Sequence, residues 1–330
     1  MKDVIFTMML IILCELNEEY IRCLDEDHHK DGKSPLSILP IGMVSQVPFE
    51  YMHLVCLGVV KKLLSAWIHG KYSQFTKLPA LSISRISTRL KILATYCPSD
   101  FVRRPRSLNE YTKYKATEFR QFLLYTGPVV TYRILNEEVY KHFLLLHAAI
   151  RILISTSPSK THLNFADLAL QKFVLRCNNL YGPTFNSYNV HGLIHLTDDV
   201  RQLGPLDSFS AFPYENNMAV FKKYCRKPGS VLQQISNRFV EMEAHAVVDY
   251  CSTDSSIHLS MRHNAGPLPC NIANCNQYRK IIFNGILLSS DVRDNCCILR
   301  DGSICIVINI FEVNNSQYLV LKKFLDIDIF

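Results

Sequence analysis

Residues 49–68, FEYMHLVCLGVVKKLLSAWI, decide the fold of this chain, because their apolar side chains recur at intervals of three and four residues. The recurring positions are Met52, Val55, Val59, Leu63, Ala66 and Trp67. This spacing places them along one side of an α-helix, where they face a protein core. The stretch therefore predicts a long amphipathic helix that begins just after Pro48.

Further helical patterns follow this stretch over most of the next two hundred residues. They cover residues 81–96, 115–127, 136–156 and 164–182. We expect the second of these to stop at Gly127 and Pro128, and the third to be capped by Asn136. The fourth is expected to begin at a cap, Asn164, and to end at Gly182. The middle of the chain is therefore predicted to be all helical.

The composition changes near residue 266, where short β-branched runs replace the helical pattern. The runs are separated by Asn284-Gly285, Asp301-Gly302 and Asn314-Asn315, which are typical of hairpin turns. We therefore predict an α+β fold that is predominantly α, with a small antiparallel β module at residues 266–330. An acidic, irregular lead is expected at residues 1–47 and a mainly helical domain at residues 48–265.

Composition narrows the class of protein and its compartment. The chain has 330 residues, of which 48% are hydrophobic and 20% charged, so it is expected to be globular rather than disordered. Its 12 cysteines are scattered, which is typical of a reducing compartment, the nucleus or the cytoplasm. The apolar run at residues 4–14 is too short to span a membrane; its alternative interpretation is a secretory signal.

Basic residues concentrate in two segments of a chain whose net charge is +7. The first segment holds Arg103, Arg104, Arg106, Lys113, Lys115 and Arg120, and the second holds Lys222, Lys223, Arg226 and Lys227. Such clusters can bind a polyanion such as DNA, although a basic run is more often a solvated face. Both interpretations stay open from the sequence.

Two acidic positions are candidates for metal chemistry. Glu215 lies in SAFPYENNM, and a carboxylate in apolar company must be paired, hydrogen-bonded or bound to a metal. Glu50 and His53 lie one helical turn apart, so they can bind a metal or orient one another. His191 and His195 have a spacing of four, which also suits a metal site or two structural histidines. With Asp198 and Asp199 close by, phosphodiester chemistry is one candidate function.

Four stretches of the sequence resemble transposase-derived proteins of the CACTA (En/Spm-type) group. They are PIGMVSQVPFEYMHLVCLGVVKKLL at residues 40–64, RRPRSL with YKATEFRQFLLYTGPVV, NVHGLIHLTDDVRQLGPLDSFSAFPYENNM at residues 189–218, and HNAGPLP with NCCILRDGSICIVINI. The resemblance implies an RNase H-like core that uses Mg²⁺ or Mn²⁺, interrupted by a helical insertion at about residues 54–185 and resumed at about 186–250. It implies that Glu215 is the last acid of a triad and that His53 belongs to an Asp-x-x-His element.

This chain departs from that family pattern at two places. Glu50 stands where the family has Asp, and residues 1–47 hold no substitute for the family's earlier acids. We therefore predict a truncated, transposase-derived protein without strand-transfer activity or cofactor, which binds DNA without sequence preference. One alternative is a nucleic-acid or protein binding module, the protein partner being bound by the β module. The other is a metal-dependent DD(E/D) nuclease or transposase.

Overall fold

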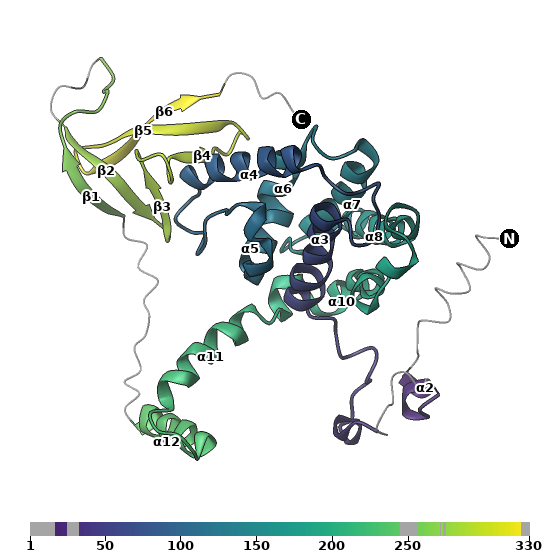
Figure 1. The fold of residues 1–330 in the computed structure, drawn as a ribbon. Helices are drawn as coiled ribbons and strands as arrows, with labels where there is room; N and C mark the ends of the chain where they lie inside the picture. The colour runs from purple at the N-terminus through teal and green to yellow at the C-terminus, as the bar shows by residue number, and fades with distance from the viewer. Residues whose placement is uncertain (1–16, 25–32, 245–256, 271, 273–274, 325–330) are drawn as a thin grey trace. The chain divides into compact units, whose positions relative to one another are not determined.

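A computed structural model describes residues 17–24, 33–244, 257–270, 272 and 275–324 (Figure 1). The chain forms two compact units, each built from two separate segments. Unit 1 comprises Met1–Leu78 and Leu135–Pro213, and unit 2 comprises Pro79–Ile134 and Tyr214–Phe330. The candidate secretory signal lies outside the described residues. The division of the chain at residues 47 and 265 stays a prediction.

Unit 1 is helical, and the helix predicted at residues 49–68 lies in its core. This helix runs without a break through η2, Met52–Val60, which has π-type hydrogen bonds, and α3, Lys61–His69. The long helices α7, Glu137–Leu153, and α8, Lys160–Tyr181, pack against each other. The shorter elements are α2 (Asn17–Ile21), η1 (Pro35–Ile38), η5 (Pro183–Phe185), α9 (Tyr188–His191), η6 (Gly192–His195), α10 (Leu196–Leu203) and η7 (Leu206–Phe209).

Aromatic side chains fill the centre of unit 1. Trp67 packs edge-on against Phe143, with 5.4 Å between ring centroids, and its Nε1 donates a hydrogen bond to the Tyr181 hydroxyl at 3.3 Å. Tyr181 in turn stacks on Phe185. All four side chains are buried, so they hold α3, α7 and α8 around a common core.

Two predicted helix ends in this region were wrong. Helix α8 begins at Lys160 rather than Asn164, because Ser159 caps it by accepting a hydrogen bond from the backbone N–H of His162. The segment at residues 115–127 does not stop at Pro128 either. It forms α5 (Ala116–Gln121), the π-type turn η4 (Phe122–Thr126) and α6 (Gly127–Thr131). The helical backbone therefore continues past Pro128, with the π-type turn η4 just before it.

Unit 2 combines the remaining helices with the β module. Its helices, besides α5 and α6, are α4 (Ala80–Thr95), η3 (Leu108–Lys113), α11 (Phe212–Tyr224) and α12 (Val231–Ala244). Its strands are β1 (His258–His263), β2 (Asn276–Phe283), β3 (Ile286–Ser289), β4 (Cys296–Ile298), β5 (Ile304–Val313) and β6 (Ser316–Lys323). The first strand thus begins before the predicted start of the module at residue 266.

The strands form one antiparallel sheet that divides into two halves. Strands β2 and β5 pair only through residues 276–278 and 310–312. Beyond that point β2 pairs with β3, while β5 pairs with β4. Strand β1 lies on the other side of β2, and β6 on the other side of β5. The connection between β3 and β4, residues 290–295, therefore lies where β2 and β5 separate.

Turn residues fix two of the hairpins as predicted. Asn284 and Gly285 have φ of 49° and 77°, and Asn314 and Asn315 have φ of 50° and 61°. Two successive positive φ angles are typical of the type I′ turn, whose twist matches paired strands. The predicted α+β class is confirmed. The RNase H-like core stays a prediction, because all six strands of the described residues belong to this C-terminal sheet.

One helical stretch of the described residues, Met52–His69, is long and apolar enough to cross a membrane. More than half of it is buried inside the protein, at 56%. Burial of this kind is also found in the core helix of a globular protein, and the contacts of Trp67 agree with such a position.

Candidate functional site

Glu50 accepts four hydrogen bonds and joins two segments of unit 1. Its Oε1 accepts from the backbone N–H groups of Met52 and Ala211, both at 2.7 Å. Its Oε2 accepts from the backbone N–H of His53 and lies 2.7 Å from the Nδ1 of the same residue. The carboxylate therefore caps the start of η2 and also holds the chain just after η7.

The hydrogen bonds of Glu50 determine its charge state. Burial alone would raise the pKa of this carboxyl, but the backbone N–H groups of Ala211, His53 and Met52, together with the His53 ring, outweigh burial and lower the pKa. Glu50 is therefore ionised at neutral pH, with both oxygens engaged inside the protein. A catalytic metal would have to replace some of these hydrogen bonds.

Residues of α9, η6 and α10 surround Phe49, which precedes Glu50. The Phe49 backbone N–H donates to Asp199 Oδ2 at 3.2 Å, and the Phe49 ring stacks on His195. The Nε2 atoms of His191 and His195 lie 3.3 Å apart. Burial lowers the pKa of His195, and the neighbouring His191 lowers it further. The structure thus brings together the two histidines that were singled out by their spacing of four.

The two aspartates beside these histidines have different environments. Asp198 is exposed and pairs with Arg201, whose Nη1 lies 2.6 Å from its Oδ1. Asp199 is half-buried, and burial raises its pKa although the Phe49 N–H partly offsets this effect. Among the described residues no three His, Cys, Asp or Glu side chains form a group that could hold a metal ion.

Glu215 lies in the first turn of α11 and is exposed. It belongs to unit 2, whereas Glu50, His53, Asp198 and Asp199 belong to unit 1. None of the 13 residues of α11 is buried. The expected apolar surroundings of Glu215 are therefore not a buried pocket, and the carboxylate stays in contact with solvent.

The second basic segment follows Glu215 along α11. Lys222 and Lys223 are exposed in the last turn of the helix. The backbone N–H groups of Arg226 and Lys227, just beyond it, both donate to Gln234 Oε1 at 2.9 and 3.1 Å. These two hydrogen bonds to the Gln234 side chain fix the turn between α11 and α12. The side chains of Lys222, Lys223, Arg226 and Lys227 lie at the surface.

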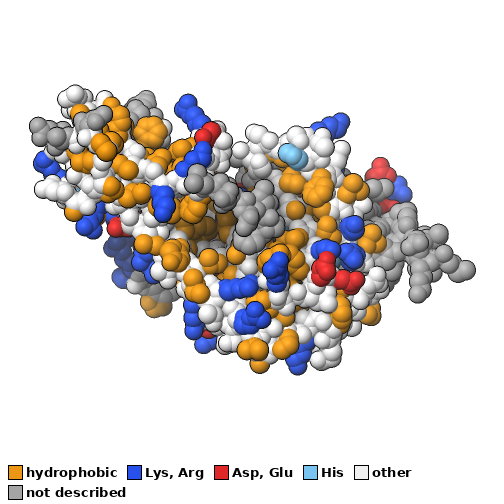
Figure 2. All heavy atoms as spheres, turned by 90° about the horizontal axis from the view of Figure 1, so that it is seen from above, with side chains coloured by type: hydrophobic (Ala, Val, Ile, Leu, Met, Phe, Trp, Pro, Cys, Tyr) orange, Lys and Arg blue, Asp and Glu red, His pale blue; other side chains and the backbone are white. Residues whose placement is uncertain are grey.

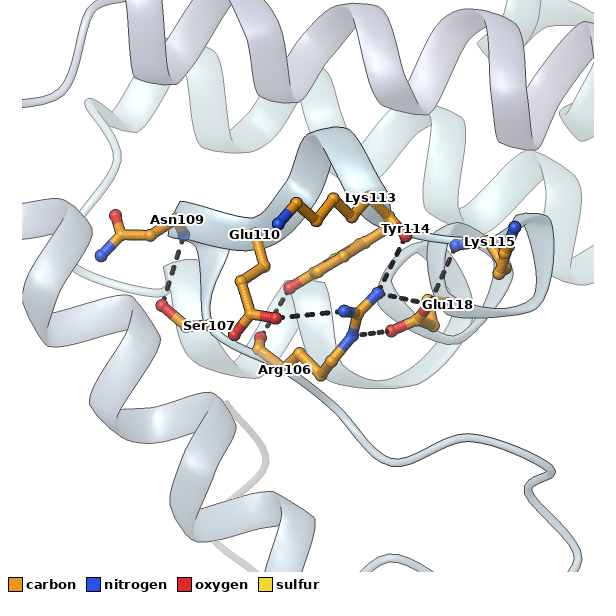
Figure 3. Close-up of polar contacts among 8 residues, drawn as sticks. All are labelled: Arg106, Ser107, Asn109, Glu110, Lys113, Tyr114, Lys115 and Glu118. Carbon is orange, nitrogen blue, oxygen red and sulfur yellow. Dashed lines mark hydrogen bonds and ion pairs between the residues drawn. The ribbon is translucent and has the colours of Figure 1, made fainter.

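In the first basic segment, Arg106 is the centre of a half-buried network of hydrogen bonds (Figure 3). Its Nε and Nη2 donate to both oxygens of Glu118 at 2.6 and 3.0 Å, and its Nη1 donates to Glu110 Oε2 at 3.1 Å. Its Nη2 also donates to the Lys113 carbonyl. Burial would raise the pKa of Glu118, but Arg106 and the Lys115 N–H outweigh it and lower the pKa. The charge of Arg106 is therefore balanced by Glu118, which is buried, and by Glu110, which is exposed.

The other cations of the first basic segment differ in how far their side chains are exposed to solvent. Arg120 is half-buried on α5. The exposed ones, which we call the loop cations, are Arg103, Arg104, Lys113 and Lys115. In the part of the chain that the structure describes, no ion pair engages these four side chains. In this segment the predicted basic face is thus reduced to four exposed residues, which flank the hydrogen bonds of Arg106.

A hollow of about 590 Å³ adjoins one of the loop cations in unit 2. It is lined by the end of α4, Arg104, Lys280 of β2, and residues 291–294 of the β3–β4 connection. Ser99 joins these parts, because its N–H and Oγ both donate to Asp294 Oδ1, at 2.9 and 3.0 Å. The hollow therefore gathers Arg104, Lys280 and Arg293 from three separate elements.

Part of this unit has a counterpart among known families. Residues 262–330 match the family described as a domain of unknown function (DUF8592). The match covers the end of β1 and all of β2 to β6, including Lys280 and Arg293. No curated protein and no solved structure matches the chain.

Sequence reasoning missed Lys280 and Arg293. Lys280 follows Arg279 in QYRK and Arg293 lies between two acids in SSDVRD; both lie outside the two basic segments, and neither stretch is a longer basic run. Only the pairing of β2 with β3 and the Ser99–Asp294 contacts bring them to Arg104. A signal confined to neighbouring residues could not have found this grouping.

Proposed function

We propose that this chain is a transposase-derived protein that binds nucleic acid through unit 2, without sequence preference and without cutting it. The observation that carries the proposal is the Arg106 network. In this network Arg106 pairs with Glu118 and Glu110, the two nearby glutamates. The same hydrogen bonds hold the segment that carries the four loop cations. Positive charge fixed on a rigid loop fits a phosphate backbone, which binds through electrostatics rather than base contacts.

The arrangement of cations also supports binding without sequence preference. Figure 2 shows one face of the molecule, on which Lys and Arg side chains lie in small groups among hydrophobic and uncharged ones. A protein that recognises a particular base sequence places several side chains inside a groove of the duplex, against the base edges. Separate surface cations instead contact phosphates, which are the same at every base pair.

A structural role for Glu50 supports the absence of catalysis. Both carboxylate oxygens hold backbone N–H groups of unit 1, and this use replaces metal binding. The proposed compartment is the nucleus or the cytoplasm, which agrees with the free cysteines of the described residues.

The test is duplex DNA binding measured by fluorescence anisotropy at low salt. A variant with Arg103, Lys113 and Lys115 changed to Gln is compared with a control in which Lys61, Lys160 and Lys172, exposed lysines of unit 1, are changed to Gln. Each variant loses three charges. We expect the first to bind at least about tenfold more weakly than the control, from three lost phosphate contacts. Equal binding by the two variants would contradict the proposal.

A second candidate function, assembly with a protein partner, is favoured by α11 and α12. Exposed apolar side chains on them include Met218, Leu232, Val240 and Met242. Phe221, Tyr224 and Phe239 join the two helices through edge-on ring contacts of 6.1–6.3 Å. Exposed apolar surface of this kind is typical of an interaction site. Light scattering of wild type against Leu232→Glu would test this, since a lower mass is expected for the variant.

A further inference from the structure

We propose that the hollow beside α4 binds a phosphate group of the nucleic-acid backbone. The inference rests on the proposed function and names a site for it. The hollow is lined by three cations, Arg104, Lys280 and Arg293, and by two carboxylates, Asp291 and Asp294. A volume of about 590 Å³ is within the range of ligand sites, roughly 300–1,000 Å³.

The three cations are available to an anion. In the described part of the chain none of them forms an ion pair with Asp291, Asp294 or any other carboxylate. Arg104 and Arg293 are exposed and Lys280 is half-buried. Three positive side chains against two carboxylates, Asp291 and Asp294, leave an excess of one positive charge around the hollow, which attracts an anion. The lining therefore favours an anionic ligand.

Of the two acidic residues, Asp294 uses its carboxylate in the fold, whereas Asp291 contributes its backbone groups. Asp294 Oδ1 accepts both hydrogen bonds of Ser99, and the Asp294 carbonyl accepts from the Ser289 N–H. The Asp291 N–H donates to Ser289 Oγ, and its carbonyl accepts from the Asp294 N–H. These contacts hold the β3–β4 connection in place. They fix the backbone position of Arg293, whose side chain lines the hollow.

The form of the hollow favours a backbone phosphate over a small free anion. The hollow is open to solvent, and two of its cations are on long, exposed side chains. An enclosed site with several backbone donors would suit a free phosphate. An open site beside the loop cations instead allows a chain of phosphates to continue in both directions.

The experiment measures binding of the full chain to a labelled duplex between 50 and 300 mM salt. The variant Lys280→Gln with Arg293→Gln is compared with a control, Arg300→Gln with Lys322→Gln. The control removes one arginine and one lysine from exposed positions of the same module, away from the hollow. We expect the hollow variant to lose about tenfold or more in affinity, and its salt slope to fall by about two. The control should lose less than about threefold.

Three results would overturn the inference. If wild type binds and both variants bind equally, the hollow is not a contact, while the proposed function stands. If wild type binds no duplex at any salt, the proposed function fails together with the inference. If inorganic phosphate displaces the duplex at matched ionic strength, the hollow holds a free anion instead. Arg293→Lys keeps the charge and should recover most of the affinity, which separates a lost contact from a misfolded loop.

Discussion

At the scale of single residues, Glu50 distinguishes a structural carboxylate from a catalytic one. Its side chain reaches Ala211, which is 161 positions away in the sequence, as well as its own helix. An aspartate, one methylene shorter, could still cap the helix but would not reach Ala211. Aspartate, which the resembling family has at this position, should therefore stabilise unit 1 less than Glu50 does.

We expect Glu50→Asp to destabilise unit 1 by about 1–3 kcal/mol, since hydrogen bonds to a charged group contribute about that much. Trp67, the chain's one tryptophan, lies in the core of unit 1, so its fluorescence during urea unfolding measures the effect. Glu138→Asp, at an exposed acid of α7, is the matched control and should change stability by less than about 0.5 kcal/mol. An unchanged unfolding midpoint for Glu50→Asp would show that the Ala211 contact contributes nothing.

His142 gives unit 1 a pH dependence. It is fully buried, its Nε2 lies 2.9 Å from the Phe173 carbonyl, and its ring stacks on Phe173. Burial, with a smaller contribution from Arg176, lowers its pKa from 6.5 to about 4. In the unfolded chain the His142 ring binds a proton below about pH 6.5, whereas in the folded chain it binds one only below about pH 4. Stability is therefore lost as pH falls through this window, by up to about 3 kcal/mol.

His142→Gln tests this expectation, because glutamine can donate to the Phe173 carbonyl but cannot bind a proton. Urea unfolding followed by Trp67 fluorescence at pH 7 and pH 5 gives the comparison. We expect wild type to lose about 2 kcal/mol more than the variant between these values. The same loss in both proteins would assign the pH dependence to other groups.

At the scale of elements, the sequence predicted helices well and their ends less well. The cap at Asn136 is confirmed, because Asn136 Oδ1 accepts from the Glu138 N–H. Asn164 is an equally good cap by composition, yet it lies inside α8 and accepts from Arg201 of α10. Two cap candidates five residues apart are decided by which residues the core can bury. That choice depends on packing with other elements, which periodicity along one helix does not contain.

The loop between α4 and α5 depends on the Arg106–Glu118 pair. Glu118 is buried with 2% of its side chain exposed, whereas a third of the Arg106 side chain is exposed. Arg106→Ala would leave a buried carboxylate without its guanidinium. We expect a local loss of about 2–3 kcal/mol, reduced from the fully buried case by the exposure of Arg106.

Amide hydrogen exchange of residues 108–121 measures this loss, because it reports on the loop itself. Exchange should accelerate in Arg106→Ala, and adding Glu118→Gln should recover part of the protection by removing the buried charge. If exchange is as slow in Arg106→Ala as in wild type, the pair does not hold the loop. Arg106 is for this reason unsuitable as a probe of DNA binding.

At the scale of the whole molecule, charge that is scattered in the sequence is gathered by tertiary structure. The first basic segment was visible as composition, but the charge of its Arg106 proved to be paired with Glu118 and Glu110. Lys280 and Arg293 lie about 180 residues beyond Arg104 and join it only through the hollow. The sequence could therefore identify a basic chain, and the pairing of strands was needed to say which cations lie together.

Unit 2 is expected to select its ligand by charge and not by base sequence. The four loop cations, together with Lys280 and Arg293, would contact phosphates and no bases. Each neutralised phosphate releases about 0.9 of a counterion, so with six contacts the logarithm of affinity should fall against the logarithm of salt concentration with a slope of about −5. Two duplexes of unrelated sequence and equal length should bind within about threefold of each other at every salt concentration. A difference of tenfold that persists at high salt would require base contacts, since phosphate contacts weaken together as counterions return.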